Sequence, residues 1–350
     1  MLITYRKHFK LLSSLLLGTS LLLTGCIQKE TITEPLSRTQ FVLGTTATIT
    51  LYDNQSEELL NKAFDKLAAL EDVLSINKTG TLIDEINDSS GKEAVAVDSA
   101  TFSLIEKGLS YSELTEGAFD LTIGPLVKLW HIGFSDAKVP TQEEIDAKLP
   151  LINYHEVLLD KAKQTVYLPQ EGMMIDLGGI GKGYAADEVA TLLRNEGTKH
   201  AIINLGGNVY TIGDKPGGKS WTIGVQDPFN PRGATIGTIG AADESLVTSG
   251  IYERYLTAED GTNYHHILDP KTGYPFNNEI AGVTIISRSS TDGDALSTAT
   301  FALGITDGLN FIEGLDDVEA IFVTTDKKVY ITSGLKTKFN LTDPNFTLCN

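Results

Sequence analysis

The chain has 350 residues and carries 28 Lys and Arg against 46 Asp and Glu, a formal net charge of −18 at pH 7. So acidic a chain would repel the phosphates of nucleic acid, and we expect none among its partners. The length is sufficient for one large domain, or two intermingled ones, with a substantial core.

The N-terminus has the pattern of a bacterial lipoprotein export signal. Three basic residues within the first ten precede an apolar stretch over 11–23, which is shorter than the ~20 residues that a membrane-spanning helix needs. The stretch closes with Leu23-Thr-Gly-Cys26, which resembles a lipobox. The alternative is an ordinary signal peptide with a chance cysteine. The resemblance implies lipidation of Cys26, and therefore an extracytoplasmic protein held at the bacterial membrane through its lipid anchor only.

The signal divides the chain into three parts. We predict a lipoprotein signal peptide over 1–25, a polar tether over 26–38 and a continuously folded domain over 39–350. With Cys26 acylated, Cys349 is the only thiol left, so no intramolecular disulfide is expected.

Helices and strands are expected in runs along the folded domain. Helical spacing of apolar residues predicts helices over 56–74, 99–113 and 185–196. Runs rich in β-branched residues predict strands over 45–52, 157–168, 201–212, 221–225, 233–239, 244–248, 264–268, 280–287, 319–324 and 329–332. Because the two kinds of element do not alternate strictly, we predict an α+β fold with largely antiparallel sheets and packed helices.

A glycine-rich turn precedes the third predicted helix. The segment Ile175-Asp-Leu-Gly-Gly-Ile-Gly-Lys-Gly-Tyr-Ala-Ala-Asp187 places glycines, an acid and Lys182 where the positive end of the helix would point at an anion. Gly183 stands where a Walker A loop has Ser or Thr, and the spacing is not GxGxxG. On its own the turn is compatible with a phosphate site or with a tight structural turn.

Two further segments combine aromatic, acidic and basic side chains. Around Gly117-Ala-Phe-Asp120 a planar ring could stack, although composition favours core packing of Phe119 and Trp130. In Tyr264-His-His-Ile-Leu-Asp-Pro270, His266 could serve as a general base, or belong to a solvated histidine pair at a strand end.

Asp294 and Thr298 are four residues apart at an expected helix start, so that carboxylate and hydroxyl share one face. Together with a backbone carbonyl, waters and phosphate oxygens they would suit Mg²⁺, which rarely takes a cage made of protein alone. The alternative is that Asp294 caps the helix, which would stabilise it by about 1 kcal/mol.

Taken in order, these segments resemble the FAD:protein FMN transferases, the ApbE-type flavin transferases, over nearly all of residues 39–350. The matching segments are Leu43-Gly-Thr45, Gly117-Ala-Phe-Asp120, Gly124-Pro-Leu126, Leu129-Trp130, Asp176-Leu-Gly-Gly-Ile-Gly-Lys-Gly-Tyr-Ala185, Asn204-Leu-Gly-Gly-Asn208, Thr248-Ser-Gly250, His266-Ile-Leu-Asp-Pro270 and Asp294-Ala-Leu-Ser-Thr298. The resemblance implies a T-fold-like α+β domain. It also implies transfer of FMN from FAD to a threonine hydroxyl of a target protein, with release of AMP and a need for Mg²⁺.

The resemblance further implies a role for individual residues. The metal would be held by Asp294, Thr298 and the carbonyl of Gly179, while His266 would help to activate the acceptor threonine. Lys182, acting with the metal, would neutralise the charge that builds on the phosphoryl oxygens. The FAD site would be lined by Leu43, Ala118, Phe119, Asp120, Asp176, Lys182 and Ile267. The acceptor would be an exported or membrane-associated protein with a Ser/Thr-x-Ala-Thr-like site.

One residue departs from the family pattern. Asn77 stands where many relatives have an aromatic residue in the FAD site, which leaves open hydrolysis of FAD to FMN and AMP, and a second metal ion. Thr300 lies in a stretch that itself resembles an acceptor signature, so that self-modification is a minor alternative. A different class, a flavin-binding lipoprotein without chemistry, is disfavoured because clustered carboxylates would hold a phosphate poorly.

Overall fold

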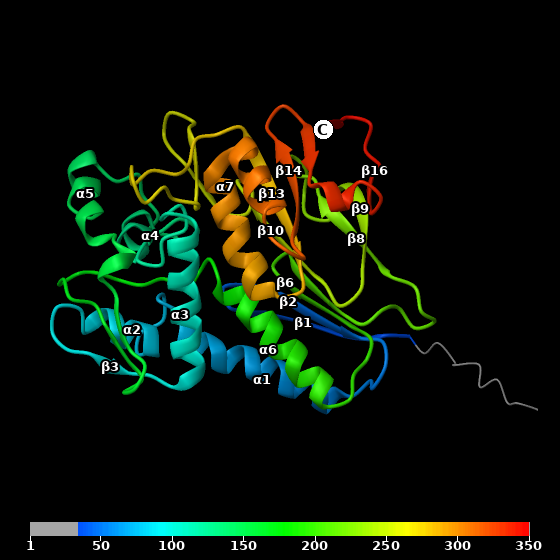
Figure 1. Ribbon diagram of the computed structural model, residues 1–350, viewed down its shortest axis with the longest axis horizontal. Coiled ribbons are helices and arrows are strands. Elements are labelled where there is room, and N and C mark those ends of the chain that lie inside the picture. Colours follow the sequence, from blue (N-terminus) through cyan, green and yellow to red (C-terminus); the bar gives the residue numbers. More distant parts are fainter. Residues whose placement is uncertain (1–33, 350) are drawn as a thin grey trace, which may run out of the picture. The chain divides into compact units, whose positions relative to one another are not determined.

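The computed structural model describes residues 34–349 (Figure 1). The predicted signal peptide and the lipidation site Cys26 lie outside these residues. Within residues 34–349, no helix combines the length and the apolar character needed to cross a membrane.

The main sheet of this part has nine strands in the order β1-β2-β6-β7-β10-β13-β14-β15-β17. Neighbouring strands are antiparallel except for the parallel pair β15 and β17. The predicted α+β class with largely antiparallel sheets is therefore confirmed. The strands are β1 (Leu36–Val42), β2 (Thr45–Leu51), β6 (Ala201–Leu205), β7 (Asn208–Ile212), β10 (Ser245–Gly250), β13 (Ile280–Ser287), β14 (Glu319–Thr324), β15 (Lys328–Ile331) and β17 (Thr347–Cys349).

Smaller sheets and the helices complete the described part. The additional strands are β3 (Val95–Ala96), β4 (Leu158–Asp160), β5 (Thr165–Tyr167), β8 (Trp221–Gln226), β9 (Thr235–Ala241), β11 (Tyr255–Thr257), β12 (Asn263–His265) and β16 (Phe339–Leu341). The helices are α1 (Glu57–Leu74), α2 (Leu82–Asp88), α3 (Ser99–Leu114), α4 (Gly124–Trp130), α5 (Gln142–Asp146), α6 (Gly181–Asn195) and α7 (Ser290–Glu313).

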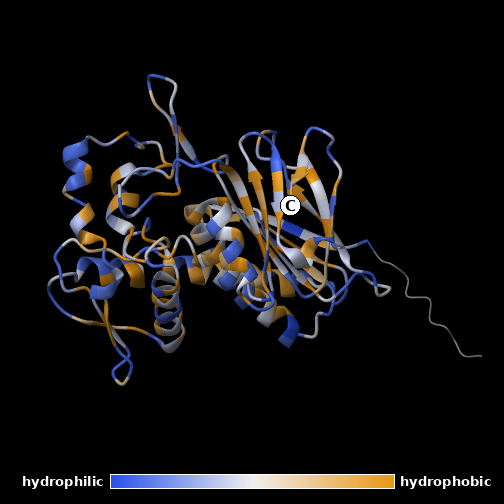
Figure 2. Cartoon of the chain, turned by 45° about the horizontal axis from the view of Figure 1, so that its top comes forward, coloured by the Kyte–Doolittle hydropathy of each residue, from blue (hydrophilic) through white to orange (hydrophobic). Residues whose placement is uncertain are grey.

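The main sheet is covered on both faces. Helices α1, α6 and α7 pack on one face, and the small sheet β16-β9-β8 covers part of the other (Figure 1). Successive residues of β13 show the alternation, because Ile285 packs with α7 while Ile286 packs with the small sheet. Hydrophobic residues accordingly concentrate in the strands of the main sheet (Figure 2).

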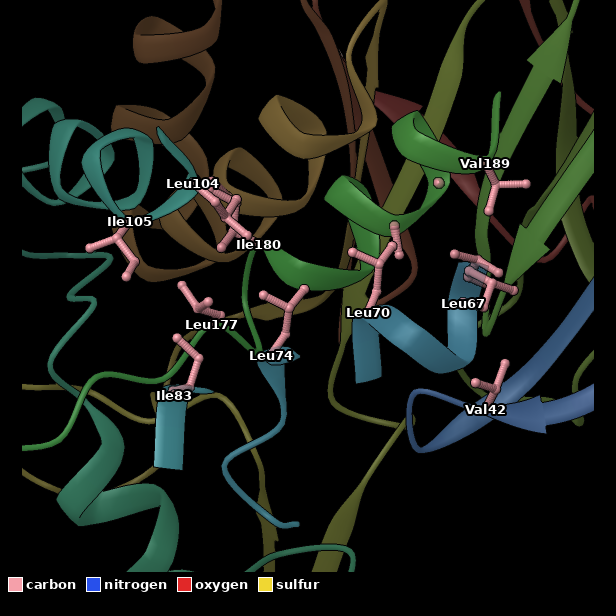
Figure 3. Packing of buried hydrophobic residues seen from close by; sticks show 14 of the residues in the cluster. Val42, Leu67, Leu70, Leu74, Ile83, Leu104, Ile105, Leu177, Ile180 and Val189 are labelled. Carbon is pink, nitrogen blue, oxygen red and sulfur yellow. The ribbon is translucent and has the colours of Figure 1, made fainter. Parts of the chain in front are cut away.

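Helix α1 illustrates why the sequence periodicity was informative. Its apolar residues recur at helical spacing, and Leu67, Leu70 and Leu74 are buried in one cluster in which Leu74 lies beside Leu177, just before α6 (Figure 3). Burying each such leucine contributes about 2 kcal/mol. This packing holds the start of α6 in place.

The structure corrects the predicted tether at its end. Residues 36–38 belong to β1, where Leu36 lies opposite Leu51 and the Arg38 guanidinium forms an ion pair with Glu57. The polar sequence concealed this strand, because β1 is an edge strand whose outer side chains face solvent.

Turns divide two of the predicted strands. The predicted strand over 157–168 is interrupted where the Asp160 carboxylate accepts hydrogen bonds from the Ala162 and Lys163 amides, which gives β4 and β5. The strand over 201–212 is broken at Gly206 and Gly207, whose φ angles are 64° and 106°. The third predicted helix starts four residues earlier than expected, at Gly181, so the glycine-rich turn runs into the first turn of α6.

Candidate active site

The first turns of α6 and α7 approach each other at Gly183. A Cβ atom at this position would lie 2.1 Å from the Ser290 carbonyl oxygen and 2.8 Å from the Asp294 Cβ. Only glycine allows so close an approach of the two helices. Part of the glycine pattern is therefore explained by helix packing, which brings Asp294 of α7 beside Lys182 of α6.

Asp294 lies at the centre of this contact. Its carboxylate is 2% exposed and accepts hydrogen bonds from Gly183 N at 2.9 Å, Asn208 Nδ2 at 3.2 Å and Lys182 Nζ at 3.1 Å. The helix cap is Ser289, whose hydroxyl oxygen accepts from the Asp292 amide. The alternative of Asp294 as a helix cap is therefore wrong, and a buried carboxylate held by two neutral donors and an ammonium remains.

Thr298 and Gly179 lie beside one another near this carboxylate. A Cβ at Gly179 would sit 3.6 Å from Thr298 Oγ1 and 2.9 Å from Cε2 of the Phe119 ring. Thr298 is half-buried on α7, one turn after Asp294, and its hydroxyl forms no side-chain hydrogen bond with any other residue in 34–349. A free hydroxyl, a carboxylate and a backbone carbonyl are oxygen donors of the kind that Mg²⁺ prefers.

These donors include only one acid. Among residues 34–349 there is no group of three or more His, Cys, Asp or Glu side chains arranged to hold a metal ion. A magnesium site at Asp294 would therefore depend on neutral oxygens, and on oxygens from water or a bound phosphate.

Two further carboxyl groups lie nearby. Burial raises the pKa of Asp176, although the Gly178 amide, at 2.8 Å, and the cations Lys128, Lys182 and Arg254 partly offset this effect. The charges of these three cations all act to lower the pKa of Asp176, so this part of the site is electropositive and suits an anion.

Asp120 follows Phe119 in the segment that precedes α4. Burial also raises the pKa of Asp120, with a partial offset from the Thr122 hydroxyl and amide, which donate to its Oδ1 at 2.6 Å and 2.7 Å. Ala118, half-buried, lies in the same segment, and the Phe119 side chain is 5% exposed.

The two adjacent histidines have different environments. His265 is buried, with Nε2 bonded to the Phe276 carbonyl at 2.8 Å and Nδ1 accepting from the Ile267 amide at 3.3 Å, so both of its nitrogens are occupied within the core. His266 Nδ1 lies 3.2 Å from the Arg254 carbonyl, to which it must donate. Its Nε2 is left as the proton acceptor.

His266 is also kept neutral. Burial, together with the positive charges of Arg254 and Lys182, lowers the pKa of His266 to about 3. A neutral imidazole with a free Nε2 can accept a proton from a hydroxyl group. His266, whose pKa the charges of Arg254 and Lys182 help to lower, thus differs from His265, whose two ring nitrogens are both bonded within the core.

The β1–β2 hairpin is tied to the same region. Leu43 and Gly44 form its two-residue turn with φ angles of 55° and 65°. The Gly44 carbonyl accepts from Arg254 Nη2 at 3.1 Å, so the residue that orients His266 also holds the turn carrying Leu43. Ile267 is 5% exposed and packs with α7. Its amide donates to His265 Nδ1 at 3.3 Å and its carbonyl accepts from the Phe276 amide at 3.0 Å, so its side chain and its backbone are both engaged within the fold.

Asn77 connects to the site through Lys128 of α4. Its side chain is exposed, and its Oδ1 accepts from Lys128 Nζ at 3.2 Å, while the same ammonium also binds the Ile76 carbonyl. The positive charge of Lys128 in turn acts to lower the pKa of the Asp176 carboxyl group.

Two interpretations of individual residues are decided by burial. Trp130 is fully buried and donates to the Gly273 carbonyl at 2.8 Å, so it packs in the core. Thr300 is also fully buried, and its hydroxyl donates to the Leu296 carbonyl at 2.6 Å within α7. Self-modification at Thr300 is therefore wrong for the folded chain, because the hydroxyl cannot reach a ligand.

Three residues near these groups were not assigned a role from the sequence: Lys128, Asn208 and Arg254. Asn208 ends the segment Asn204-Leu-Gly-Gly-Asn208, and its position directly after the glycine pair is a signal from which it could have been found. Nothing in the sequence around Lys128 or Arg254 distinguishes them from surface cations.

Comparisons with known proteins identify the family of this chain. The model of the ApbE family covers residues 43–322. The chain is 40% identical to an FAD:protein FMN transferase of Klebsiella pneumoniae, over 87% of this chain and 94% of that protein. It is 34% identical to one of Treponema pallidum, over 89% and 91%.

Solved structures agree with the sequence relatives. The ApbE protein of Thermotoga maritima superposes with a TM-score of 0.79 at 34% identity, over 87% of this chain and 98% of that one. The flavin transferase ApbE of Vibrio cholerae gives a TM-score of 0.77 at 27% identity, over 87% and 99%. The chain therefore belongs to the ApbE family.

Proposed function

We propose that this protein is a Mg²⁺-dependent FAD:protein FMN transferase, which moves FMN from FAD to a threonine hydroxyl of a target protein and releases AMP. The names of its relatives support the transfer reaction. The observation that carries the assignment to this site is the contact of Lys182 with the buried Asp294, together with a neutral His266 whose pKa the Lys182 charge helps to lower.

The donor groups fit a magnesium ion. Asp294, the free hydroxyl of Thr298 and the carbonyl of Gly179 would hold it, and the Lys182 ammonium shows that Asp294 accepts a cation beside its two neutral donors. When bound, the ion would withdraw charge from the phosphoryl oxygens. Lys182, Lys128 and Arg254 supply further positive charge around Asp176, where the pyrophosphate would lie.

The remaining residues would orient and deprotonate the nucleophile. His266 Nε2 would take the proton from the acceptor threonine as its oxygen attacks the phosphorus of the FMN moiety. The bond from that phosphorus to the bridging oxygen breaks, and AMP leaves with the electron pair. Phe119 and Leu43 would position the flavin nucleotide. A positioned base of this kind accelerates a reaction typically ~10²- to 10⁴-fold.

A second activity is favoured by one observation. Asn77 is exposed and bonded to Lys128, so the site lacks an aromatic wall at this position. Water could then replace threonine as the nucleophile, and FAD would be hydrolysed to FMN and AMP. A flavin-binding protein without chemistry gives no reason for a neutral histidine beside the cations.

The proposal is tested by measuring AMP. Purified protein is mixed with FAD and Mg²⁺, with and without a polypeptide acceptor that contains Ser-Gly-Ala-Thr. We expect AMP release that rises on addition of the acceptor and stops on chelation of Mg²⁺. Tight FAD binding without AMP under either condition would contradict the proposal and favour the non-catalytic alternative.

We also propose that the protein is an extracytoplasmic lipoprotein anchored through Cys26, on the basis of the basic, apolar and Leu-Thr-Gly-Cys pattern at its N-terminus. With Cys26→Ser the protein should move from the membrane fraction to the soluble fraction, because the lipid attachment point is lost. The purified variant should keep full activity. A variant that still requires detergent for extraction would show that the apolar stretch is itself retained as the anchor.

A further inference from the structure

A cavity of about 450 Å³ lies at the edge of the main sheet that β1 and β2 form, next to the candidate active site. It is bounded by the β1–β2 hairpin, the β8–β9 loop and the segment after β10. The residues that give it its chemical character are Phe41, Thr46, Thr48, Asn204, Arg232 and Arg254. We call it the hairpin groove. Of the residues that we place around FAD, only Arg254, one of the cations near the expected pyrophosphate position, lines it.

The strand register explains the groove. Phe41 lies opposite Thr46, and Thr48 lies opposite Asn204, so these side chains share one face of the sheet. Ile202, two residues before Asn204, lies on the same face and packs against the small sheet β16-β9-β8. The small sheet does not extend to β1, and the strand face beyond it remains open.

Arg254 joins the hairpin groove to the catalytic groups. The residue lines the groove, while its backbone carbonyl accepts from His266 Nδ1 at 3.2 Å. Its guanidinium donates to the Gly44 carbonyl at the hairpin turn, and its positive charge acts to lower the pKa of both His266 and Asp176. A molecule lying in the groove would therefore reach His266 around the tip of the hairpin.

The chemistry of the groove suits a polypeptide with a negative charge. Two arginines against one glutamate, Glu253, make it locally positive in a chain whose net charge is −18. Hydroxyl and amide side chains can bond to a peptide backbone, and Phe41 is 78% exposed. A large aromatic side chain left open beside polar groups is typical of an anchor for a protein partner.

We propose that the hairpin groove binds the acceptor protein. An extended segment next to the reactive threonine lies in it, with a carboxylate near Arg232 and Arg254 and an apolar side chain against Phe41. The groove thus selects acceptors with an acidic flank and delivers the threonine to His266. This inference rests on the proposed transfer to a protein threonine.

The test uses two acceptor polypeptides and one charge reversal. Both polypeptides contain Ser-Gly-Ala-Thr, one with acidic residues beside it and one with the corresponding amides. In Arg232→Glu the groove loses its net positive charge, because Glu253, the present ion-pair partner of Arg232, stays in place. The matched control is Arg288→Glu, an 81% exposed arginine that pairs with Asp317 and does not line the groove.

We expect the wild type and the Arg288→Glu variant to prefer the acidic acceptor. In Arg232→Glu the kcat/KM for that acceptor should fall about 10-fold and its salt dependence should weaken, as for a charge at the rim of an interface. The KM for FAD should not change. Phe41→Ser should raise the acceptor KM for both polypeptides, while Leu158→Ser, which removes a 54% exposed side chain of β4, should not.

Three results would overturn the inference. The first is an unchanged acceptor preference in Arg232→Glu. The second is a raised KM for FAD with an unchanged acceptor KM, which would make the groove part of the FAD site. The third is a wild type that binds FAD but transfers FMN to neither polypeptide. This result would refute the proposed function as well, and it differs from the first two because the wild type itself fails.

Discussion

Replacement of Asp294 by asparagine separates its chemical role from its structural one. The carboxylate accepts from Gly183 N on Oδ2 and from Asn208 Nδ2 on Oδ1, both in a buried setting. In either orientation, the Asp294→Asn amide presents an NH₂ group to one of these donors. One unsatisfied buried donor costs about 1–3 kcal/mol.

Loss of the ion pair with Lys182 lowers the free energy of unfolding by a smaller amount. The Lys182 side chain is 29% exposed, so solvent screens the pair and its loss adds at most about 1 kcal/mol. We therefore expect Asp294→Asn to lower the free energy of unfolding by about 1–4 kcal/mol. Transfer should fall at least ~100-fold, because the carboxylate that would hold the metal and fix Lys182 is gone.

The matched control is Ser289→Ala, which removes the cap of the same helix at a cost of about 1 kcal/mol. It should leave the transfer rate nearly unchanged. Stability is measured by urea denaturation, and activity by AMP release at a temperature where both variants remain folded. Equal activity losses in the two variants, or a folded Asp294→Asn with wild-type turnover, would refute the assigned role of Asp294.

Three further outcomes follow from the structure. Gly183→Ala should lower the free energy of unfolding by about 3 kcal/mol, because its Cβ would lie 2.1 Å from the Ser290 carbonyl oxygen. Gly181→Ala is the control, because the nearest atoms to its Cβ are 3.9 Å away. In the same urea denaturation assay it should leave the free energy of unfolding unchanged or raise it by up to about 1 kcal/mol. The folded-state pKa of His266 is lowered to about 3, below the ~6.5 of an unfolded chain, so its contribution to stability is complete above pH ~6.5 and is lost as the pH falls from there towards 3. Denaturation at a series of pH values should thus show a shallower loss for His266→Gln than for the wild type, and identical slopes would contradict the assignment. Asn77→Tyr should suppress AMP release in the absence of an acceptor while transfer to threonine persists, since an aromatic wall excludes water; equal hydrolysis by both forms would leave Asn77 as an ordinary loop residue.

Elements with a strong pattern of their own could be predicted from the sequence. Strands β13 and β14 have the predicted bounds, and α1 starts one residue later than expected, because Ser56 is its cap. Alternation and helical spacing determine such elements locally. Strand β1 was missed because its outer residues are polar and its pairing with β2 is a tertiary property.

The candidate site shows the same division. Lys182, Asp294 and His266 lie in segments whose composition singles them out, although each segment was also compatible with a structural role. Arg254 could not be found this way, since its position beside His266 depends on how the hairpin and the segment after β10 fold together. The choice between His265 and His266 likewise required the tertiary burial of each ring.

Attachment of FMN to a threonine oxygen is tested by tandem mass spectrometry of an acceptor polypeptide incubated with the enzyme, FAD and Mg²⁺. We expect one FMN on the threonine of Ser-Gly-Ala-Thr, with AMP released in equal amount, and no adduct when that threonine is valine. An adduct on the valine form, or AMP release with the threonine form left unmodified, would contradict it.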